Sequence, residues 1–203
     1  MKKGLQLSLL FIFATFQIFA QNQNYRSTLS VNAGFSAVGS LISIADDFSA
    51  DTKSYAVPAI QLTYDKGIQK WFSIGLATSY QTMGIEYKGY EYMQDGEIVT
   101  EDFKTNISRL NVAVRPLFHY GNINRFDMYS GLRVGVTNWS INTKTNDPNY
   151  DPENDVSFGN GINFAAQVIL YGLRGYFTDN LGANFELALG SPHFASFGLN
   201  YRW

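Results

Sequence analysis

Apolar and polar residues alternate along most of this chain with a period of two. Between Trp71 and Met83, for example, Phe72, Ile74 and Leu76 alternate with small or polar residues. A period of two is typical of a β-strand with one apolar face, because successive side chains point to opposite sides. The pattern occurs eight times and predicts strands at residues 28–38, 57–65, 71–83, 106–120, 126–141, 161–177, 181–189 and 194–203.

The alternation breaks down within one of these segments, residues 161–177. Apolar residues of one parity continue from Ile162 to Leu170. Further along the segment the pattern is lost, because Ile169, Tyr171 and Leu173, which belong to the other parity, are also apolar. A β-bulge adds one residue to a strand and so exchanges the faces of all the residues that follow. We therefore expect a bulge or a shift of parity in the second half of this strand.

The connections between the segments alternate in length. Short turns follow the second, fourth and sixth segments, whereas long polar stretches follow the first, third and fifth, at residues 39–54, 84–105 and 142–160. Most segments reach the roughly 9–11 residues that a tilted strand needs to cross a bilayer. These features predict an all-β, eight-stranded antiparallel up-and-down transmembrane β-barrel. The dipeptide Asp95-Gly96 favours a hairpin turn, so we expect the third and fourth strands to extend beyond the membrane as a ribbon.

In each predicted strand, every second residue belongs to the polar set, which we call the polar parity. Its composition indicates which face of the strands meets lipid. A soluble periplasmic barrel would turn its apolar parity inward and expose Lys and Glu on its strands. Here the lysines after residue 20 all lie in predicted turns or loops, and the polar parity consists mainly of Gly, Ala, Ser, Asn, Gln and Arg. Small polar residues suit the narrow interior of an eight-stranded barrel. Charged groups inside must pair, which predicts a lumen charge network of Arg109, Arg115, Arg133, Glu186 and Arg202.

Aromatic residues cluster near the predicted short turns, as expected for rings at the headgroup level of a membrane. The cluster consists of Tyr64, Trp71, Phe72, Phe118, Tyr120, Phe126, Tyr176, Phe177, Tyr201 and Trp203.

The N-terminus has the layout of a secretory signal peptide. Lys2 and Lys3 precede an apolar run that ends at Ala20, and the chain then becomes polar. We expect residues 1–20 to be a signal peptide and residues 21–203 to form the barrel domain; an uncleaved membrane anchor is the alternative. The sequence contains no cysteine, which excludes disulfides, thiolate metal sites and a lipid-modified cysteine.

Two stretches near the C-terminus, GLRGYFTDNLGANFELALG and FASFGLNYRW, resemble the closing hairpin of small outer-membrane β-barrel proteins of Gram-negative bacteria. The resemblance is greatest to the outer-membrane β-barrel domain that is common in Bacteroidota. It implies eight antiparallel strands, periplasmic N- and C-termini and long loops that face outward. It also implies that Trp203 is the signal read by the barrel-assembly machinery. It does not imply one activity.

Few residues suggest catalysis. The chain has no paired metal ligands and no phosphate-binding loop, so we expect no enzyme activity, no cofactor and no metal. His193 and Ser196 invite comparison with lipid A deacylases, which are also eight-stranded barrels. Those enzymes have the spacing H-x-S, however, and residues three apart in a strand point to opposite faces.

The long loops hold most of the 17 acidic residues. One loop spaces oxygen ligands two residues apart, as in the first half of a calcium loop, but it lacks the turn glycine. This possible cation-binding loop consists of Asp147, Asn149, Asp151, Glu153 and Asp155; an ordinary solvated loop is the alternative.

Together these features predict a non-enzymatic, monomeric outer-membrane barrel with a side-chain-filled lumen. It would act through its acidic extracellular loops in adhesion, partner contact or envelope integrity. The alternatives are a narrow channel or small-solute transporter and, third, a lipid-modifying barrel enzyme. The expected partners are outer-membrane lipid, the barrel-assembly machinery and an extracellular loop partner, and we expect no nucleic acid.

Overall fold

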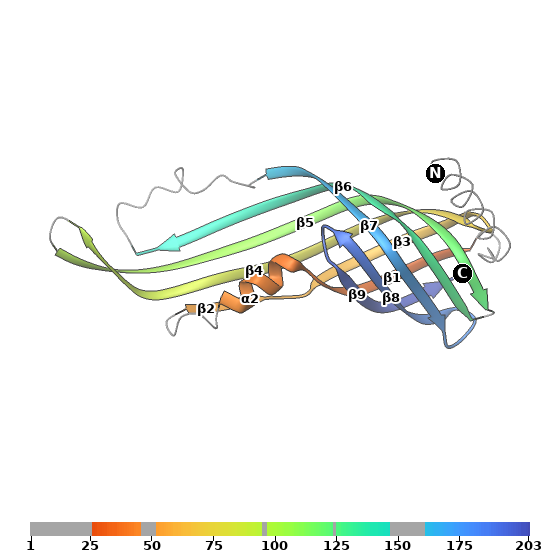
Figure 1. The fold of residues 1–203 in the computed structure, drawn as a ribbon, viewed down its shortest axis with the longest axis horizontal. Helices are drawn as coiled ribbons and strands as arrows, with labels where there is room; N and C mark the ends of the chain where they lie inside the picture. The colour runs from red at the N-terminus through yellow and green to blue at the C-terminus, as the bar shows by residue number, and fades with distance from the viewer. Residues whose placement is uncertain (1–25, 46–51, 95–96, 124, 147–160) are drawn as a thin grey trace, which may run out of the picture.

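A computed structural model describes residues 26–45, 52–94, 97–123, 125–146 and 161–203. The predicted signal peptide, residues 1–20, lies outside these ranges. The strands of the described residues are β1 (Ser27–Phe35), β2 (Thr52–Ala56), β3 (Ala59–Gln69), β4 (Phe72–Gln94), β5 (Glu97–Ile123), β6 (Phe126–Thr145), β7 (Gly161–Tyr176), β8 (Leu181–Gly190) and β9 (Ala195–Arg202). One helix, α2 (Ala37–Ala45), follows β1 (Figure 1).

Eight of these strands close into a barrel. The order β4-β3-β1-β9-β8-β7-β6-β5 is completed by pairing of β4 with β5, and every pair is antiparallel. The remaining strand, β2, pairs with residues 83–87 of β4, beyond Tyr80, where the pairing of β4 with β3 stops. The closed ladder of β1 and β3–β9 leaves no edge within the ring, which is the requirement for strands surrounded by lipid. The predicted eight-stranded antiparallel barrel is confirmed.

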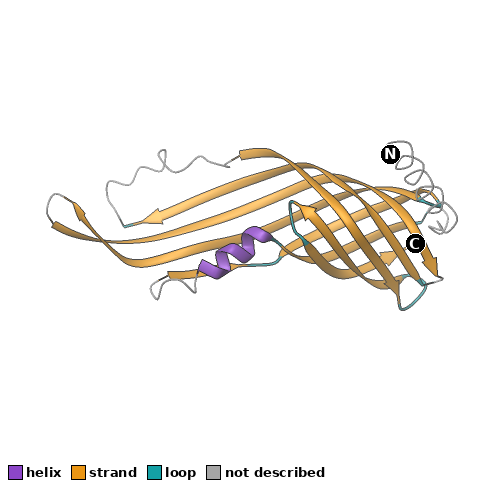
Figure 2. Cartoon of the chain, in the orientation of Figure 1, coloured by secondary structure: helices purple, strands orange, loops and turns teal. Residues whose placement is uncertain are grey.

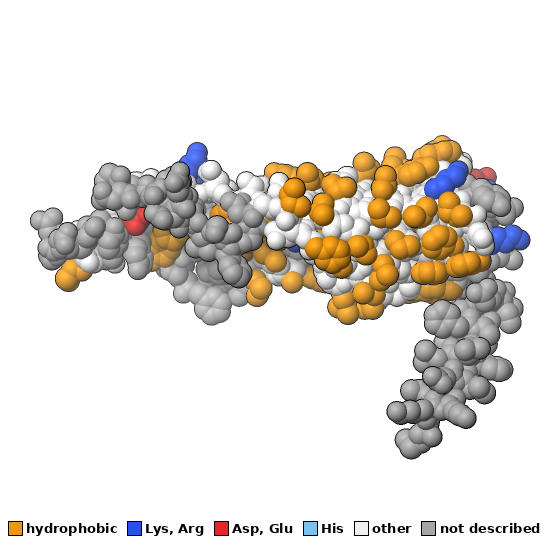
Figure 3. Space-filling model, turned by 90° about the horizontal axis from the view of Figure 1, so that it is seen from above, with side chains coloured by type: hydrophobic (Ala, Val, Ile, Leu, Met, Phe, Trp, Pro, Cys, Tyr) orange, Lys and Arg blue, Asp and Glu red, His pale blue; other side chains and the backbone are white. Residues whose placement is uncertain are grey.

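The two faces of the wall are chemically opposite. Val112, Val114 and Phe185 are 48, 43 and 39% exposed on the outside, whereas Gln61 and Asn200 are buried inside. On the face shown in Figure 3, hydrophobic side chains are spread over the barrel half of the molecule, between stretches of backbone and other side chains. An apolar exterior around a polar interior is the arrangement of transmembrane barrels and the reverse of a soluble one.

The apolar exterior has the height of a membrane. On β4 it runs from Phe72 to the 53% exposed Tyr80, eight positions further along the strand. At about 3.4 Å per residue and a tilt of about 40°, this distance corresponds to roughly 21 Å along the barrel axis, close to the approximately 25 Å band of outer-membrane barrels.

Three strands continue well beyond this band. β4 and β5 stay paired up to Gln94 opposite Glu97, and β6 pairs with β5 up to Thr145 opposite Phe103. The predicted ribbon is therefore confirmed, but it is wider than expected. Because β2 and β6 flank β4 and β5, a four-stranded sheet rises from one side of the barrel (Figure 2). We call it the extracellular sheet, in keeping with the orientation proposed below.

Residues 39–54, predicted as a polar loop, contain part of helix α2 and of strand β2 instead. Ser36 caps the helix by accepting a hydrogen bond from Gly39 N at 3.0 Å, and its hydroxyl also donates to Gln81 on β4. A nine-residue helix and a five-residue strand are too short to show a clear hydrophobic period. Within the described ranges, no helix is long and apolar enough to cross a bilayer.

The expected irregularity in the strand at residues 161–177 is present. The register between β7 and β8 shifts between Ile169 and Tyr171. Ile169 faces the lumen before the shift, and Arg174 faces it afterwards, although the two residues have opposite parity. The bulge therefore turns Arg174 inward.

Candidate functional site

Buried ion pairs occupy the middle of the lumen. Glu186 on β8 accepts hydrogen bonds from Arg133 on β6, at 2.8 Å, and from Arg115 on β5. The Nε atom of Arg115 lies 3.2 Å from Asp65 on β3. All four side chains are at most 2% exposed. The structure thus brings together Arg115, Arg133 and Glu186 of the predicted network and adds Asp65.

A second ion pair spans the lumen from wall to wall. Arg174 on β7 pairs with Asp65 on β3, and these strands are four places apart in a ring of eight. Tyr129 packs between the charges. Its hydroxyl donates to Glu186 at 2.7 Å, and its ring centroid lies 4.6 Å from the Arg174 guanidinium. The ring also covers Gly172, where a Cβ would lie 2.2 Å from a ring carbon. Side chains therefore cross the full diameter of the barrel.

A hydrogen-bonded chain fills the short-turn end of the lumen. Ser73 Oγ lies 2.8 Å from His119 Nε2, and His119 Nδ1 lies 2.7 Å from Asp127 Oδ1. Arg174 approaches the other oxygen of Asp127 at 3.5 Å. The order serine, histidine, aspartate is that of a hydrolase triad. Ser73 is only 1% exposed, however, so a substrate carbonyl has no route to its hydroxyl. These hydrogen bonds hold the packing of the short-turn end of the lumen together.

The turn between β8 and β9 folds into the opposite end of the lumen. Arg109 donates to the carbonyl of Pro192, and Gln167 donates to the carbonyl of His193. The His193 ring packs against Gly34, where a Cβ would lie 2.8 Å from a ring atom. The lumen is thus filled by Pro192 and His193 at the end from which the extracellular sheet rises.

Two arginines of the predicted network lie apart from the central cluster. Arg109 contacts the Trp139 ring at 5.3 Å near the sheet end. Arg202 lies at the other end, where its Nε donates to the Asp179 carbonyl at 2.7 Å and its guanidinium lies 3.5 Å from the Tyr176 ring. Tyr176 was expected in the exterior aromatic cluster, but it is buried. That expectation is wrong because the bulge in β7 exchanges the faces beyond Leu170.

The other predicted site residues are placed as follows. Trp203 is exposed on the exterior, with its ring centroid 6.1 Å from that of Tyr64. His193 and Ser196 are both buried, and no hydrogen bond among the described residues joins them. Because His193 precedes β9, the parity rule for strands does not apply to this pair. The possible cation-binding loop, Asp147, Asn149, Asp151, Glu153 and Asp155, lies outside the described residues. In the described part of the chain, no group of three or more His, Asp or Glu could hold a metal.

Sequence reasoning missed Asp65, Asp127 and Arg174 as members of the lumen network. Asp65 was placed at the end of a predicted strand, where the short turn begins, but β3 continues to Gln69. Arg174 follows the bulge and therefore has the parity expected of a lipid-facing residue. The signal available in all three cases was a charge within or beside a predicted membrane strand, where an unpaired charge is costly.

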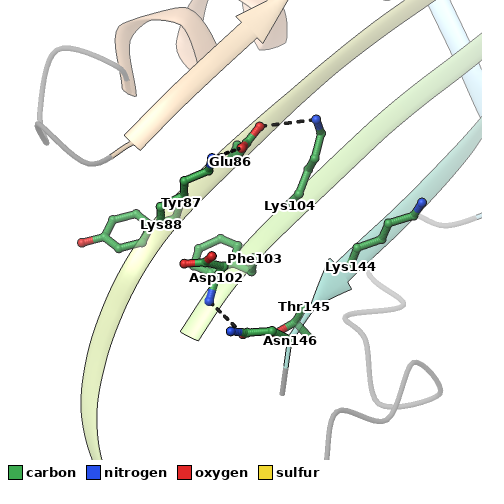
Figure 4. A pocket seen from close by; sticks show the side chains of 9 residues that line it. All are labelled: Glu86, Tyr87, Lys88, Asp102, Phe103, Lys104, Lys144, Thr145 and Asn146. Carbon is green, nitrogen blue, oxygen red and sulfur yellow. Dashed lines mark hydrogen bonds and ion pairs between the residues drawn. The ribbon is translucent and has the colours of Figure 1, made fainter. Parts of the chain in front are cut away.

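The extracellular sheet carries a shallow pocket of about 230 Å³ at the end of β6 (Figure 4). In it, the Glu86 carboxylate lies 3.3 Å from the Lys104 ammonium and 3.4 Å from that of Lys88. These hydrogen bonds, first that of Lys104 and then that of Lys88, hold the pKa of Glu86 below its ordinary value. Tyr87 and Phe103 stack nearby, with their ring centroids 5.6 Å apart. The pocket therefore combines cations, the carboxylates of Glu86 and Asp102, and aromatic rings.

Comparisons with known proteins give only distant similarity. No family model and no curated protein matches the chain. Among solved structures, the chain is similar to the attachment invasion locus protein Ail of Yersinia pestis in complex with the heparin analogue sucrose octasulfate. The identity is 11% and the TM-score 0.42, covering 88% of this chain and 99% of that one. It is also similar to the outer membrane protein Ail of Yersinia pestis in a phospholipid bilayer nanodisc, with 15% identity and a TM-score of 0.42, covering 89% of this chain and all of that one. Because this likeness is weak, the assignment of a transmembrane barrel rests on the strand pairing and on the two faces of the wall.

Proposed function

We propose that the protein is a non-enzymatic outer-membrane barrel that does not conduct solutes and that acts through its extracellular sheet. The observation that carries this proposal is the filling of the lumen. Ion pairs join opposite walls at mid-height, and the turn with Pro192 and His193 is held inside one end by Arg109 and Gln167. Eight strands enclose just enough space for such side chains.

The proposed orientation places the sheet outside the cell and both chain ends in the periplasm. Residues Ser27 and Trp203 pair with each other, with Ser27 N donating to Trp203 O at 3.0 Å. They lie at the short-turn end, opposite the sheet (Figure 1). In barrels of this class, short turns are periplasmic and long segments are extracellular.

Adhesion, contact with a partner or maintenance of the envelope are roles that such a sheet could serve. Its ribbon exposes large apolar residues, including Met93 at 76% and Ile98 at 70%. Exposed apolar residues on a rigid support favour contact with another molecule over a purely solvated surface. The predicted acidic loops would add charge around this support.

Conductance in planar bilayers tests the filled lumen. The purified barrel should give no current steps above the lipid baseline, while a large porin in the same bilayer serves as the positive control. Reproducible steps with the wild-type protein would favour the alternative, a narrow channel or small-solute transporter.

Cysteine labelling in intact cells tests the orientation, since the natural chain has no cysteine. A membrane-impermeant maleimide should label M93C in whole cells. It should label D179C, in the turn between β7 and β8, only after the outer membrane has been permeabilised. The reverse pattern would contradict the proposed orientation.

A further inference from the structure

We propose that the outward face of the extracellular sheet binds the phosphorylated sugar headgroup of a glycolipid in the surrounding outer leaflet. This inference rests on the extracellular orientation proposed above, and it assigns a specific ligand chemistry to that sheet. Three observations carry it. They are the register of the four strands, the imbalance of charge among the residues that this register aligns, and the height of those residues above the apolar band.

The register aligns four charged residues in a row across the sheet. Lys53 on β2 is opposite Glu86 on β4, Glu86 is opposite Lys104 on β5, and Lys104 is opposite Lys144 on β6. Direct cross-strand partners share a face of the sheet. This face continues the even-numbered, lipid-facing positions of β4, β5 and β6, such as Leu76. The row therefore lies on the outward face of the sheet, pointing away from the barrel axis.

The charges in this row do not balance. Lys104 and Lys144 are directly opposite each other, which is unfavourable for like charges. The two oxygens of Glu86 are already in contact with Lys88 and Lys104. Asp102, on the same face, accepts a hydrogen bond from Gly89 N. Within the described ranges, no carboxylate forms an ion pair with Lys53 or Lys144. An anion held between Lys104 and Lys144 would turn their repulsion into attraction.

Height above the apolar band favours a glycolipid over a phospholipid. Glu86 lies six positions beyond Tyr80 on β4, so the row is roughly 15 Å above the end of the band for a tilted strand. Phospholipid headgroups add only about 5–8 Å to each side of the hydrocarbon core. A headgroup that reaches the row must therefore be longer, as a chain of sugars is.

The residues just below the row suit a sugar. Tyr55, opposite Gly84, is 41% exposed, and its ring covers Gly84 so closely that a Cβ there would lie 2.7 Å from a ring carbon. Its hydroxyl is fixed by a hydrogen bond to Asn106 Oδ1 at 2.6 Å. Asn142 is opposite Asn106 and exposed. A rigid aromatic ring beside two amides offers one apolar surface and several hydrogen-bonding groups, about 7 Å along the strand from the lysines.

Binding to defined lipids tests this inference with the full chain in detergent. Native mass spectrometry would measure the affinity for a rough-type lipopolysaccharide with a phosphorylated core, for the same glycolipid after chemical dephosphorylation, and for phosphatidylglycerol. The test variant is K104Q/K144Q. The matched control is K66Q/K70Q, which removes two exposed lysines from the short-turn end. Heat-modifiable gel migration would verify that every variant is folded.

We expect the phosphorylated glycolipid to bind the wild type and K66Q/K70Q equally, and K104Q/K144Q about 30-fold more weakly, the equivalent of ~1 kcal/mol for each lysine. Dephosphorylation should lower the affinity of the wild type to a similar degree. Equal binding to wild type and K104Q/K144Q, or equal binding of phosphatidylglycerol and the glycolipid, would overturn the inference. So would complete displacement by 10-fold excess inorganic phosphate, which would assign the lysines to a soluble anion. The labelling of M93C reports separately on the orientation, so the two proposals can fail independently.

Discussion

Replacing Glu186 with glutamine should remove much of the stability of the barrel. Glu186 is fully buried and pairs with both Arg115 and Arg133. The E186Q variant keeps the shape of the side chain and one acceptor oxygen, but it loses the charge. Arg115 retains the carboxylate of Asp65, whereas Arg133 is left with neutral hydrogen-bond acceptors only, such as Gln167.

The expected loss follows from leaving one buried guanidinium unpaired. Removal of one partner from a buried ion pair costs about 3–5 kcal/mol, a large part of the roughly 5–15 kcal/mol that holds a typical domain folded. With a urea dependence of about 2 kcal/mol per molar, the unfolding midpoint should fall by about 2 M. The assay is urea unfolding of the barrel in lipid vesicles, followed by the fluorescence of the three tryptophans.

Two further variants separate charge pairing from other effects. E86Q removes a carboxylate from the solvent-exposed extracellular sheet and should leave the midpoint unchanged. E186Q/R133M removes both members of one buried pair and should recover most of the loss, since no unpaired charge remains at that position. An unchanged midpoint for E186Q would refute the reasoning, because it would mean that the arginines do not depend on Glu186.

Three other predictions address packing, catalysis and pH. G172A should lower the free energy of unfolding by about 1–3 kcal/mol in the same assay, because the new methyl group overlaps the Tyr129 ring; G175A, where a Cβ would lie 3.3 Å from Phe126, should cost less. A fluorophosphonate probe should label neither the wild type nor S73A. Labelling of the wild type that is lost in S73A and in H119N would reveal a working triad. The lowered pKa of Glu86 means that any stabilisation it provides is present above the ordinary pKa of glutamate and is lost as the pH falls through the lowered value. In an NMR titration K104Q should raise the pKa of Glu86 more than K88Q does, and equal shifts would contradict the leading role of Lys104.

The strands and their orientation could be predicted from the sequence because both depend on a local, repeated signal. Residues such as Val112 and Val114 alternate with polar neighbours, and the absence of lysine from the predicted membrane segments indicated which face meets lipid. The hairpin dipeptide Asp95-Gly96 likewise gave the ribbon of β4 and β5, which the register confirms.

The lumen contacts could not be predicted in the same way, since they join residues far apart in the chain. Asp65 and Arg174 meet only because β3 and β7 face each other across the closed ring. The bulge in β7 was expected, but its position within the strand decides whether Arg174 and Tyr176 point inward. Helix α2 and strand β2 were missed because each is too short to display a period of its own.

The continuity of β4 and β5 has a mechanical consequence. β5 is 27 residues long, about 90 Å at the usual rise of a strand, and it runs without interruption from the membrane base to the tip of the sheet. A force that pulls on the tip along the strands would be shared by many ladder hydrogen bonds loaded together in shear, rather than opening them one after another. The sheet would therefore transmit tension to the barrel as a stiff tether instead of stretching like a flexible loop.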